Sequence, residues 1–516
     1  MLSSRRNHPR SLCWSQTTVP LGKSSSQSNS FRRGAIGTAR PAVQQVQGGH
    51  ATHPLTRVDE NQQLFDYERR VKASFDAIVP VLKRISALQH EEGFEVQAQA
   101  IARKQLGFDL PAEILGDAWV DQLDMRRLFA GCLFETYRRF CDEFFTEDPL
   151  GSEKEEQAFH AFLQDCGFHT LDVSPCADGR LAHVIRYVLR LPYRAVRRKS
   201  YAGAMFDVDD SIQKWVETEM LRLREDRPNG GDMPTRYLKV AVYHYSSGDP
   251  DNQGCAAHGS DATRAAQGGL DQLRAFRQAI ENSFCCGASI DLLLIGLDTD
   301  TDVIRVHVPN ASGDIDLERY LDAGDARQET LRLSAYEAEA RISELVYAMA
   351  DNVAPGMAKL ITRLLVNNFS QIDYVRAFHG EHYEDIGHAE RFIGAGIGFE
   401  EVQLRNLTYF AYLDTVEAAT QDLDVGVSIF SKLNVSHGLP IPVVVRYDYH
   451  GQVPGARERA VKHCARVTDA LTTRYAKLAE SGLLHTLQVV RDCNIGGRIE
   501  VLACSVDAQA VQEAHG

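Results

Sequence analysis

The chain lacks long apolar runs. No stretch approaches the roughly 20 consecutive apolar residues that a membrane-spanning helix requires, and the start of the chain has no apolar core of a secretory signal. We therefore expect a cytosolic protein without a membrane segment. Regularly spaced cysteines are missing as well. The eleven cysteines are odd in number and scattered over 516 residues, which is not the pattern of a disulfide framework. The thiols should then be reduced and available to a metal ion.

Acidic residues are missing from the first 53 positions, although the whole chain has a net charge of −14. The acidic total argues against a general nucleic-acid-binding protein. Residues 1–55 are rich in Ser, Gln, Gly and Arg and poor in apolar side chains, so we expect a disordered basic tail. This tail is either simply solvated or a tether that docks on an acidic partner. An organelle transit peptide is a third interpretation of an acid-poor, Arg-rich start.

Three folded regions are expected after the tail. The hydrophobic content of 44% and the charged content of 24% are those of a globular protein. Apolar residues recur mostly at helical steps over residues 56–150, which predicts a small helical bundle. Beyond it, strands alternate with helices, which predicts an α/β (or α+β) fold with mostly parallel sheets flanked by helices. We divide this part into residues 151–385 and 386–516.

One short motif stands out after a predicted strand. The run Ser-Pro-Cys-Ala-Asp-Gly-Arg, residues 174–180, follows the apolar stretch from Phe168 to Val173. If the chain stays extended there, Cys176, Asp178 and Arg180 face one side, because side chains two apart point the same way. A soft anionic ligand, a carboxylate and a permanent cation would then surround one point.

Two further metal-binding side chains lie downstream. His244 is near the end of a second predicted strand, and Cys255 follows it. Ligands collect beyond the carboxyl ends of strands in such sheets, so these groups meet Cys176 if the two strands are neighbours. Two cysteines and a histidine suit Zn²⁺, and three protein ligands leave a fourth position open, as catalytic sites do. If His258 supplied a fourth ligand instead, the metal would be structural.

The second half of the α/β part looks like a repeat of the first. Val444–Tyr449 parallels Val240–Tyr245, and Leu407–Asp414 parallels Leu171–Asp178. The repeat therefore predicts a second copy that keeps the scaffold and lacks the metal site. In this register the replaced positions are Tyr412 for Cys176, Asp448 for His244 and Val416 for Arg180.

These motifs resemble a known family. Cys-x-Asp-x-Arg after one strand, with His and Cys further on, is the pattern of β-class carbonic anhydrases. Ordinary members space the later ligands His-x2-Cys, whereas ten residues separate His244 from Cys255 here. That longer spacing resembles the carboxysome shell carbonic anhydrases, a subclass formerly called the ε class. The resemblance runs from about residue 54 to the end and is carried by the strings SPCADGR, GCAAHGSD, CCGASIDLLLIG, LDTDTD, SQIDYV and GHAERFI.

The resemblance implies a helical domain, a catalytic domain of the β-carbonic-anhydrase type and a ligand-free copy of it. It also implies interconversion of CO2 and bicarbonate, with one Zn²⁺ per chain on Cys176, His244 and Cys255 and with Asp178 and Arg180 in catalysis. The protein would supply CO2 to Rubisco inside the carboxysome, at the inner side of the shell or in the lumen, within the bacterial cytoplasm. Expected partners are Rubisco or shell proteins through the basic tail, and a homodimer or dimer-based oligomer, with no nucleic acid and no membrane.

Arg180 and Asp178 also have a chemical rationale of their own. Two thiolates cancel the charge of Zn²⁺, so water held there is less acidic than water held by three neutral imidazoles. Arg180 is a fixed cation, and by pairing with Asp178 it would keep that carboxylate ionised and aimed at the water as an acceptor.

Alternatives remain for the protein and for two of its features. A zinc-stabilised structural or adaptor protein of the shell is the second functional class. For the polar loop that carries His379, His382 and His388, hydrogen bonding at the surface or at a domain interface is favoured over a second metal site. The resemblance implies a third option, that a residue such as His388 reaches the active site across the interface between the two α/β regions. The adjacent Cys285 and Cys286 favour buried packing over a redox pair.

Overall fold

The computed structural model describes residues 51–118, 122–147, 153–192, 195–224, 236–284, 289–350, 352–399, 403–411, 420–494 and 498–507. Most of the predicted tail and the Cys285-Cys286 pair lie outside the described residues. Among the helices described, none is both long enough and apolar enough to cross a membrane.

The predicted helical region forms first along the chain. Its helices arise from apolar residues at helical spacing: Leu64, Val71 and Phe75 of the first helix are all buried on one face. Acidic residues Asp59 and Glu60 lie in the first turn of that helix, where they interact favourably with the helix dipole. The helices are α1 (Val58–Asp76), α2 (Ile78–Ser86), α3 (Phe94–Gln105), α4 (Ala112–Asp117) and α5 (Met125–Glu147).

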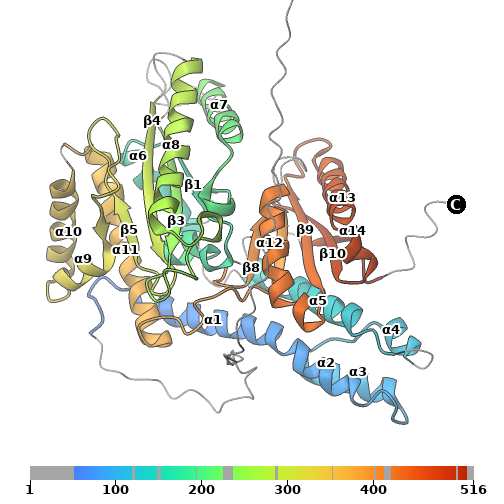
Figure 1. Ribbon diagram of the computed structural model, residues 1–516. Helices are drawn as coiled ribbons and strands as arrows, with labels where there is room; N and C mark the ends of the chain where they lie inside the picture. Colours follow the sequence, from blue (N-terminus) through green and yellow to red (C-terminus); the bar gives the residue numbers. More distant parts are fainter. Residues whose placement is uncertain are drawn as a thin grey trace, which may run out of the picture. The chain divides into compact units, whose positions relative to one another are not determined.

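A first sheet follows, with strand order β2-β1-β3-β4-β5-β6. The first four of these strands run parallel, and β5 and β6 are antiparallel to their neighbours. β3 is buried along almost its whole length, as expected for a central parallel strand covered on both faces, and α8 lies along β3 and β4 (Figure 1). The elements are α6 (Glu153–Asp165), β1 (Thr170–Pro175), β2 (Arg197–Arg198), α7 (Val208–Arg224), β3 (Arg236–Tyr245), α8 (Ala262–Phe284), β4 (Ser289–Asp298), β5 (Ile304–His307), β6 (Leu321–Asp322), α9 (Ala323–Thr330), α10 (Ala335–Met349) and α11 (Pro355–His379).

A second sheet follows with strand order β11-β10-β9-β7-β8. It repeats the arrangement of the first sheet, since the strands from β8 to β10 are parallel and β11 is antiparallel to β10. The predicted fold class is confirmed. The elements are β7 (Phe392–Ile397), β8 (Thr408–Ala411), α12 (Thr420–Leu433), β9 (Ile441–Tyr449), α13 (Ala456–Arg474), α14 (Ala476–Glu480), β10 (Leu484–Asp492) and β11 (Glu500–Cys504).

One part of the predicted repeat is wrong. We matched Leu407–Asp414 to the strand that precedes Cys176, but β8, within that stretch, is the outer strand. The neighbour of β9 is β7, as β1 is the neighbour of β3, so Phe392–Ile397 is the true counterpart of β1. Short apolar strands look alike in sequence, and only their pairing separates them. The predicted substitutes Tyr412 and Val416 lie outside the described residues.

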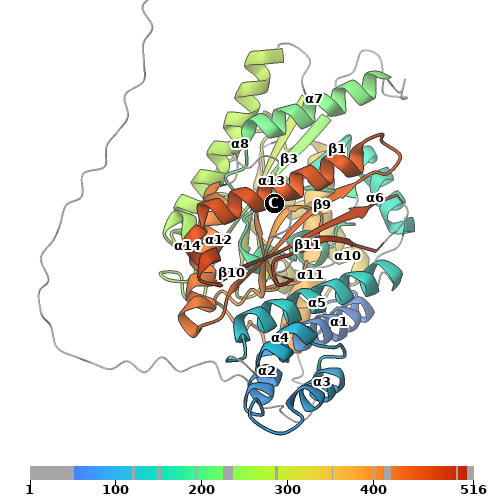
Figure 2. The same cartoon turned by 90° about the vertical axis from the view of Figure 1, so that its right-hand side faces the viewer.

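The helical region does not have a core of its own. Leu133 and Tyr137 of α5 share one apolar cluster with Val444, Leu487 and Val489 of the second sheet. The opposite face of that sheet, including Val443 and Val445, packs against α13, which lies across β9 and β10 (Figure 2). The alternation of strand side chains between two faces therefore joins the helical region to the second α/β unit.

A buried ion cluster replaces the metal-site histidine in the second sheet. Asp448, at the register position of His244, accepts hydrogen bonds from Arg446 at 2.7 and 3.0 Å and from Arg491 at 3.3 Å. The two arginine side chains are 0% and 1% exposed. Arg446 also donates to the Tyr137 hydroxyl at 3.0 Å. Buried charges need such partners, so this position holds an ion pair where the first sheet holds His244.

The folded chain begins before residue 56. His53, which we assigned to the tail, is buried; its backbone N–H donates to Asp373 at 2.9 Å and its ring lies 3.1 Å from the hydroxyl of Thr330. Leu55 packs against the core of the first sheet.

Candidate metal centre

The ends of two adjacent strands bring the predicted ligands together. β1 and β3 are parallel neighbours, with Pro175 opposite Val242. Cys176 therefore leaves β1 beside the segment of β3 that carries His244, and the chain returns through a loop to Cys255. This meeting at the carboxyl ends of neighbouring strands is the arrangement expected from the sequence.

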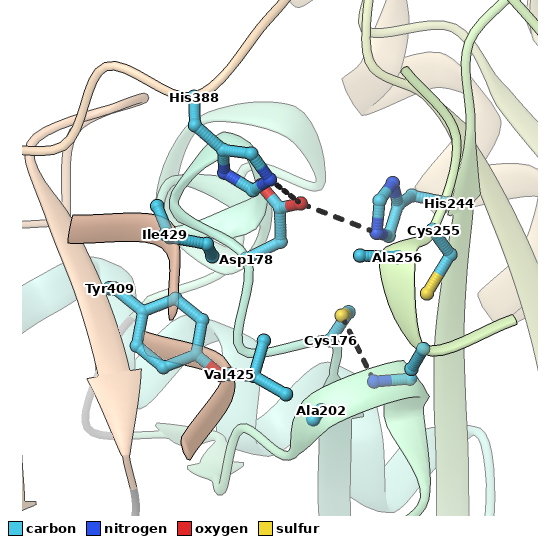
Figure 3. A pocket seen from close by; sticks show the side chains of 12 residues that line it. Cys176, Asp178, Ala202, His244, Cys255, Ala256, His388, Tyr409, Val425 and Ile429 are labelled. Atoms are coloured by element: carbon cyan, nitrogen blue, oxygen red, sulfur yellow. Dashed lines mark hydrogen bonds and ion pairs between the residues drawn. The ribbon is translucent and has the colours of Figure 1, made fainter. Parts of the chain in front are cut away.

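The three side chains form a compact set of donors. The ligand atoms of Cys176, His244 and Cys255 all lie within 4.8 Å of one another, and all three residues are buried (Figure 3). Both ring nitrogens of His244 are buried without a hydrogen-bond partner, which is costly unless something else satisfies them. Two sulfurs and an imidazole suit Zn²⁺, so these residues could hold a zinc ion and leave a coordination position open.

A backbone N–H group hydrogen-bonds the sulfur of Cys176. The N–H of Gly203, in the short 3₁₀ turn Ala202–Ala204, donates to the Cys176 sulfur at 3.2 Å. The backbone N–H of His258 donates to the carbonyl oxygen of Cys255 at 3.0 Å. A hydrogen bond between the two thiols raises the pKa of Cys176 and lowers that of Cys255, so Cys255 is the thiol that ionises more readily.

Asp178 and Arg180 form a buried pair beside the ligands, but by a turn and not by an extended strand. Asp178 caps the 3₁₀ turn Gly179–Leu181 and accepts the backbone N–H of Arg180 at 2.9 Å. The guanidinium folds back onto the same carboxylate, with bonds of 3.0 and 2.7 Å from Nε and Nη2. The pair expected from the sequence is therefore present, but a turn forms it and not the extended backbone that we predicted.

The charge of Asp178 is fixed by its surroundings. Burial opposes its ionisation, but the charges of Arg180, His388 and His244 outweigh burial and hold its pKa well below the usual value. The Oδ2 atom lies 3.6 Å from Nε2 of His244. Asp178 is thus an ionised acceptor that points at the metal-binding group.

The loop that carries Cys255 also fixes Arg180. Arg180 Nη1 donates to the carbonyl oxygen of Gln253 and, at 3.0 Å, to that of Ile386. Arg180 Nη2 lies 3.4 Å from the carbonyl oxygen of Gly254. The side chain is 1% exposed. Because backbone oxygens take up the N–H groups that Asp178 leaves free, this arginine cannot turn away without losing several bonds.

His388 lines the site. The interpretation that we favoured from the sequence, hydrogen bonding at the surface or at a domain interface, did not place it there. Its Nε2 lies 3.8 Å from Oδ2 of Asp178 (Figure 3), and its Nδ1 lies 3.0 Å from Oε1 of Glu390. Glu390 is buried and also accepts the N–H of Gly179 at 3.1 Å. Burial lowers the pKa of His388, but Asp178 and Glu390 outweigh it and raise the pKa to about 8.

His258 is not part of the ligand set. Its Nε2 lies 3.1 Å from the carbonyl oxygen of Gly203, and the described metal-binding groups do not include it. The structure therefore gives no support to a fourth protein ligand from this residue.

Both α/β units build the walls of the site. Ala202, Ala256 and Ala257 come from the first unit, and Tyr409, Val425 and Ile429 come from the second. The cavity has a volume of about 10 Å³, roughly the space that one water molecule needs. Small apolar and aromatic walls around a few polar groups suit a very small substrate.

Known proteins match nearly the whole chain. Models of the N-terminal, catalytic and C-terminal domains of the carboxysome shell carbonic anhydrase family match residues 53–145, 158–388 and 389–506. A carboxysome shell carbonic anhydrase of Prochlorococcus marinus is 58% identical over 91% of this chain and 92% of that protein. One of Parasynechococcus marenigrum is 57% identical over 90% and 80%, and one of Halothiobacillus neapolitanus is 45% identical over 87% and 90%.

We predict that the two sulfurs are required for metal binding. Cys176→Ser and Cys255→Ser should each lower the metal affinity of the full chain at least about 100-fold, because even outer-shell changes cost about 10- to 100-fold. Elemental analysis of purified protein measures the bound metal. The control is Cys504→Ser, at a partly exposed position of β11, which should leave the metal content unchanged. Full metal content in both site variants would remove the sulfurs from the ligand set.

Proposed function

The chain belongs to the carboxysome shell carbonic anhydrase family, and from that premise we propose that it interconverts CO2 and bicarbonate with one zinc ion held by Cys176, His244 and Cys255. The observation that carries the proposal is the convergence of these three buried donors beside the ionised Asp178. A zinc ion with one open position supplies Lewis acidity there and lowers the pKa of water toward neutrality. The two boundaries between folded domains predicted from the sequence, at about residues 150 and 385, are part of this proposal.

Asp178 is the orienting group in this proposal. Its pKa is too low for it to keep a proton near neutral pH, so it acts as an acceptor that aligns the attacking water and does not carry the proton away. Arg180 holds the carboxylate in place with two hydrogen bonds. The carbonyl oxygens around Arg180 keep that pair rigid, which places the nucleophile before CO2 arrives.

His388 is the proton carrier in this proposal. Hydration of CO2 releases a proton, which needs an acceptor other than Asp178. The imidazole of His388 is nearby, and its side chain is 23% exposed, whereas Asp178 is 5% exposed. Glu390 binds Nδ1 and thereby leaves Nε2 to face Asp178. With a pKa of about 8, His388 accepts a proton during hydration above that pH and donates one during dehydration below it.

The cellular role proposed here is the supply of CO2 to Rubisco. The relatives are named for the carboxysome shell, which supports our proposal that the chain acts in the carboxysome, on the inner side of the shell or in its lumen. Residues 1–50 are basic and carry no acidic side chain, which suits an acidic surface of Rubisco or of a shell protein. A homodimer or dimer-based oligomer is part of the same proposal. The alternative is a zinc-stabilised adaptor without catalysis. That hypothesis accounts for the basic tail, but it gives the Asp178–Arg180 pair no role.

The central test measures zinc and hydration on the same sample. The full chain should bind about one zinc ion and should accelerate CO2 hydration in a pH-indicator assay; a chelator should abolish the activity and added Zn²⁺ should restore it. Asp178→Asn should keep the zinc and lose turnover by about 100-fold or more, whereas the exposed control Asp314→Asn should not. Activity that survives full removal of zinc would refute the proposal, and zinc without activity would favour the adaptor.

A second prediction concerns the proton carrier. His388→Ala should lower kcat about 10- to 100-fold in weak buffer, because proton release slows, while kcat/KM for CO2 stays close to the original value. Imidazole added to the assay should restore much of the lost kcat. The control is His382→Ala, an exposed histidine of the same loop. A loss of kcat that imidazole does not relieve would contradict this role.

A third prediction concerns the tail. Deletion of residues 1–50 should leave hydration intact and weaken binding to purified Rubisco or shell protein, since screening by salt weakens such charge contacts. The binding of the full chain should therefore fall as salt rises from about 50 to 500 mM. Binding that ignores both the deletion and the salt would exclude an electrostatic tether.

A further inference from the structure

The hydrogen bond from Gly203 to the Cys176 sulfur depends on a precisely shaped turn. Gly203 has a φ of +67°, and a Cβ added there would lie 2.8 Å from Nε2 of His258 and 2.9 Å from Cβ of Ala257. The backbone conformation and the close approach both require glycine. In this conformation the Gly203 N–H donates to the sulfur of Cys176 at 3.2 Å.

Two side chains hold this turn from opposite ends. His258, from the short 3₁₀ turn Ala256–His258, places Nε2 at 3.1 Å from the carbonyl oxygen of Gly203. Asp422, from α12 of the second α/β unit, accepts the N–H of Ala202 at 2.7 Å. Asp422 is buried, and the Tyr409 hydroxyl donates to its backbone oxygen at 2.9 Å. The turn is therefore fixed from both α/β units.

The bond to sulfur has a chemical consequence for a metal. A thiolate that accepts an N–H bond donates less charge to its metal, and such partners outside the ligand set tune metal acidity. Such reduced charge donation is useful here, because water bound to zinc is less acidic with two thiolate ligands than with three imidazoles. The Gly203 N–H therefore draws charge from the sulfur of Cys176.

We propose that His258 and Asp422 are positioning residues that hold the Ala202–Gly203 peptide against Cys176 and so keep the bound zinc acidic. The proposal rests on the proposed zinc function. It gives His258 a role that its Cys-x2-His spacing suggested without defining, and it gives the ligand-free second unit a direct part in the chemistry of the first.

The test replaces zinc by Co²⁺ in the full chain and reads the thiolate-to-metal charge-transfer band. His258→Leu and Asp422→Ala should each move this band to longer wavelength, because the sulfur becomes more electron-rich, while the ligand-field bands keep their tetrahedral intensity. With zinc, the same variants should shift the pH profile of kcat/KM upward, which costs about 3- to 10-fold at pH 7.

Matched variants separate positioning from simple damage. His258→Gln keeps a side-chain N–H and should restore the band and the pH profile. Asp424→Asn, an exposed position of α12 bonded to Arg474, should change neither. A band and a pH profile that stay unchanged in His258→Leu and Asp422→Ala would overturn the inference. If Asp422→Ala fails to fold, the Leu and Gln variants of His258 decide the question alone. Failure of the proposed zinc function would look different, since the unaltered chain would then show no thiolate band at all.

Discussion

The parallel pairing of β1 with β3 is the constraint on which the site depends. The register that sets Pro175 opposite Val242 brings Cys176 to the segment of β3 that carries His244. A shift by one residue would turn the alternate side chains to the opposite face and separate the donors. The burial of both strands in one apolar core fixes that register, so the hydrophobic core also sets the geometry of the three side chains that could hold a metal ion.

In both sheets, an aspartate at the end of one strand accepts hydrogen bonds from two backbone N–H groups. Asp298 at the end of β4 accepts the N–H groups of Ser247 and Asp300, and Asp492 at the end of β10 accepts those of Gly451 and Asn494. This pattern of an aspartate that accepts two backbone N–H groups recurs in the second unit, where an ion pair stands in place of His244. We therefore infer that it stabilises the fold and takes no part in the reaction. The repeat thus separates the residues that build the fold from those that perform the reaction.

Sequence patterns predicted the parts of the site that follow local rules. The sequence could predict the donor set Cys176, His244 and Cys255 because each residue lies at or after a strand end, where ligands gather. Their side chains are also typical zinc donors. The alternation of strand and helix patterns along the sequence was enough to predict the α/β fold. The match of Leu407–Asp414 to β1 failed because an apolar strand does not encode its neighbour. Residue patterns did not place His388 and Glu390 in the site because they enter from a distant loop, and a histidine in a polar loop has no spacing rule that ties it to Asp178.

The walls and clamps of the cavity come from both halves of the chain, with Tyr409 and Asp422 on one side and Cys176 and Gly203 on the other. After a duplication, the copy that loses its own metal is normally free to drift or to be deleted. Here it is not free, because exchanges at the second-half residues that line the cavity or bond its turn would alter a site whose candidate metal donors lie in the first half. The two halves must therefore evolve as one unit, and a gene shortened to the part that carries all three ligands would not encode a smaller version of the same enzyme.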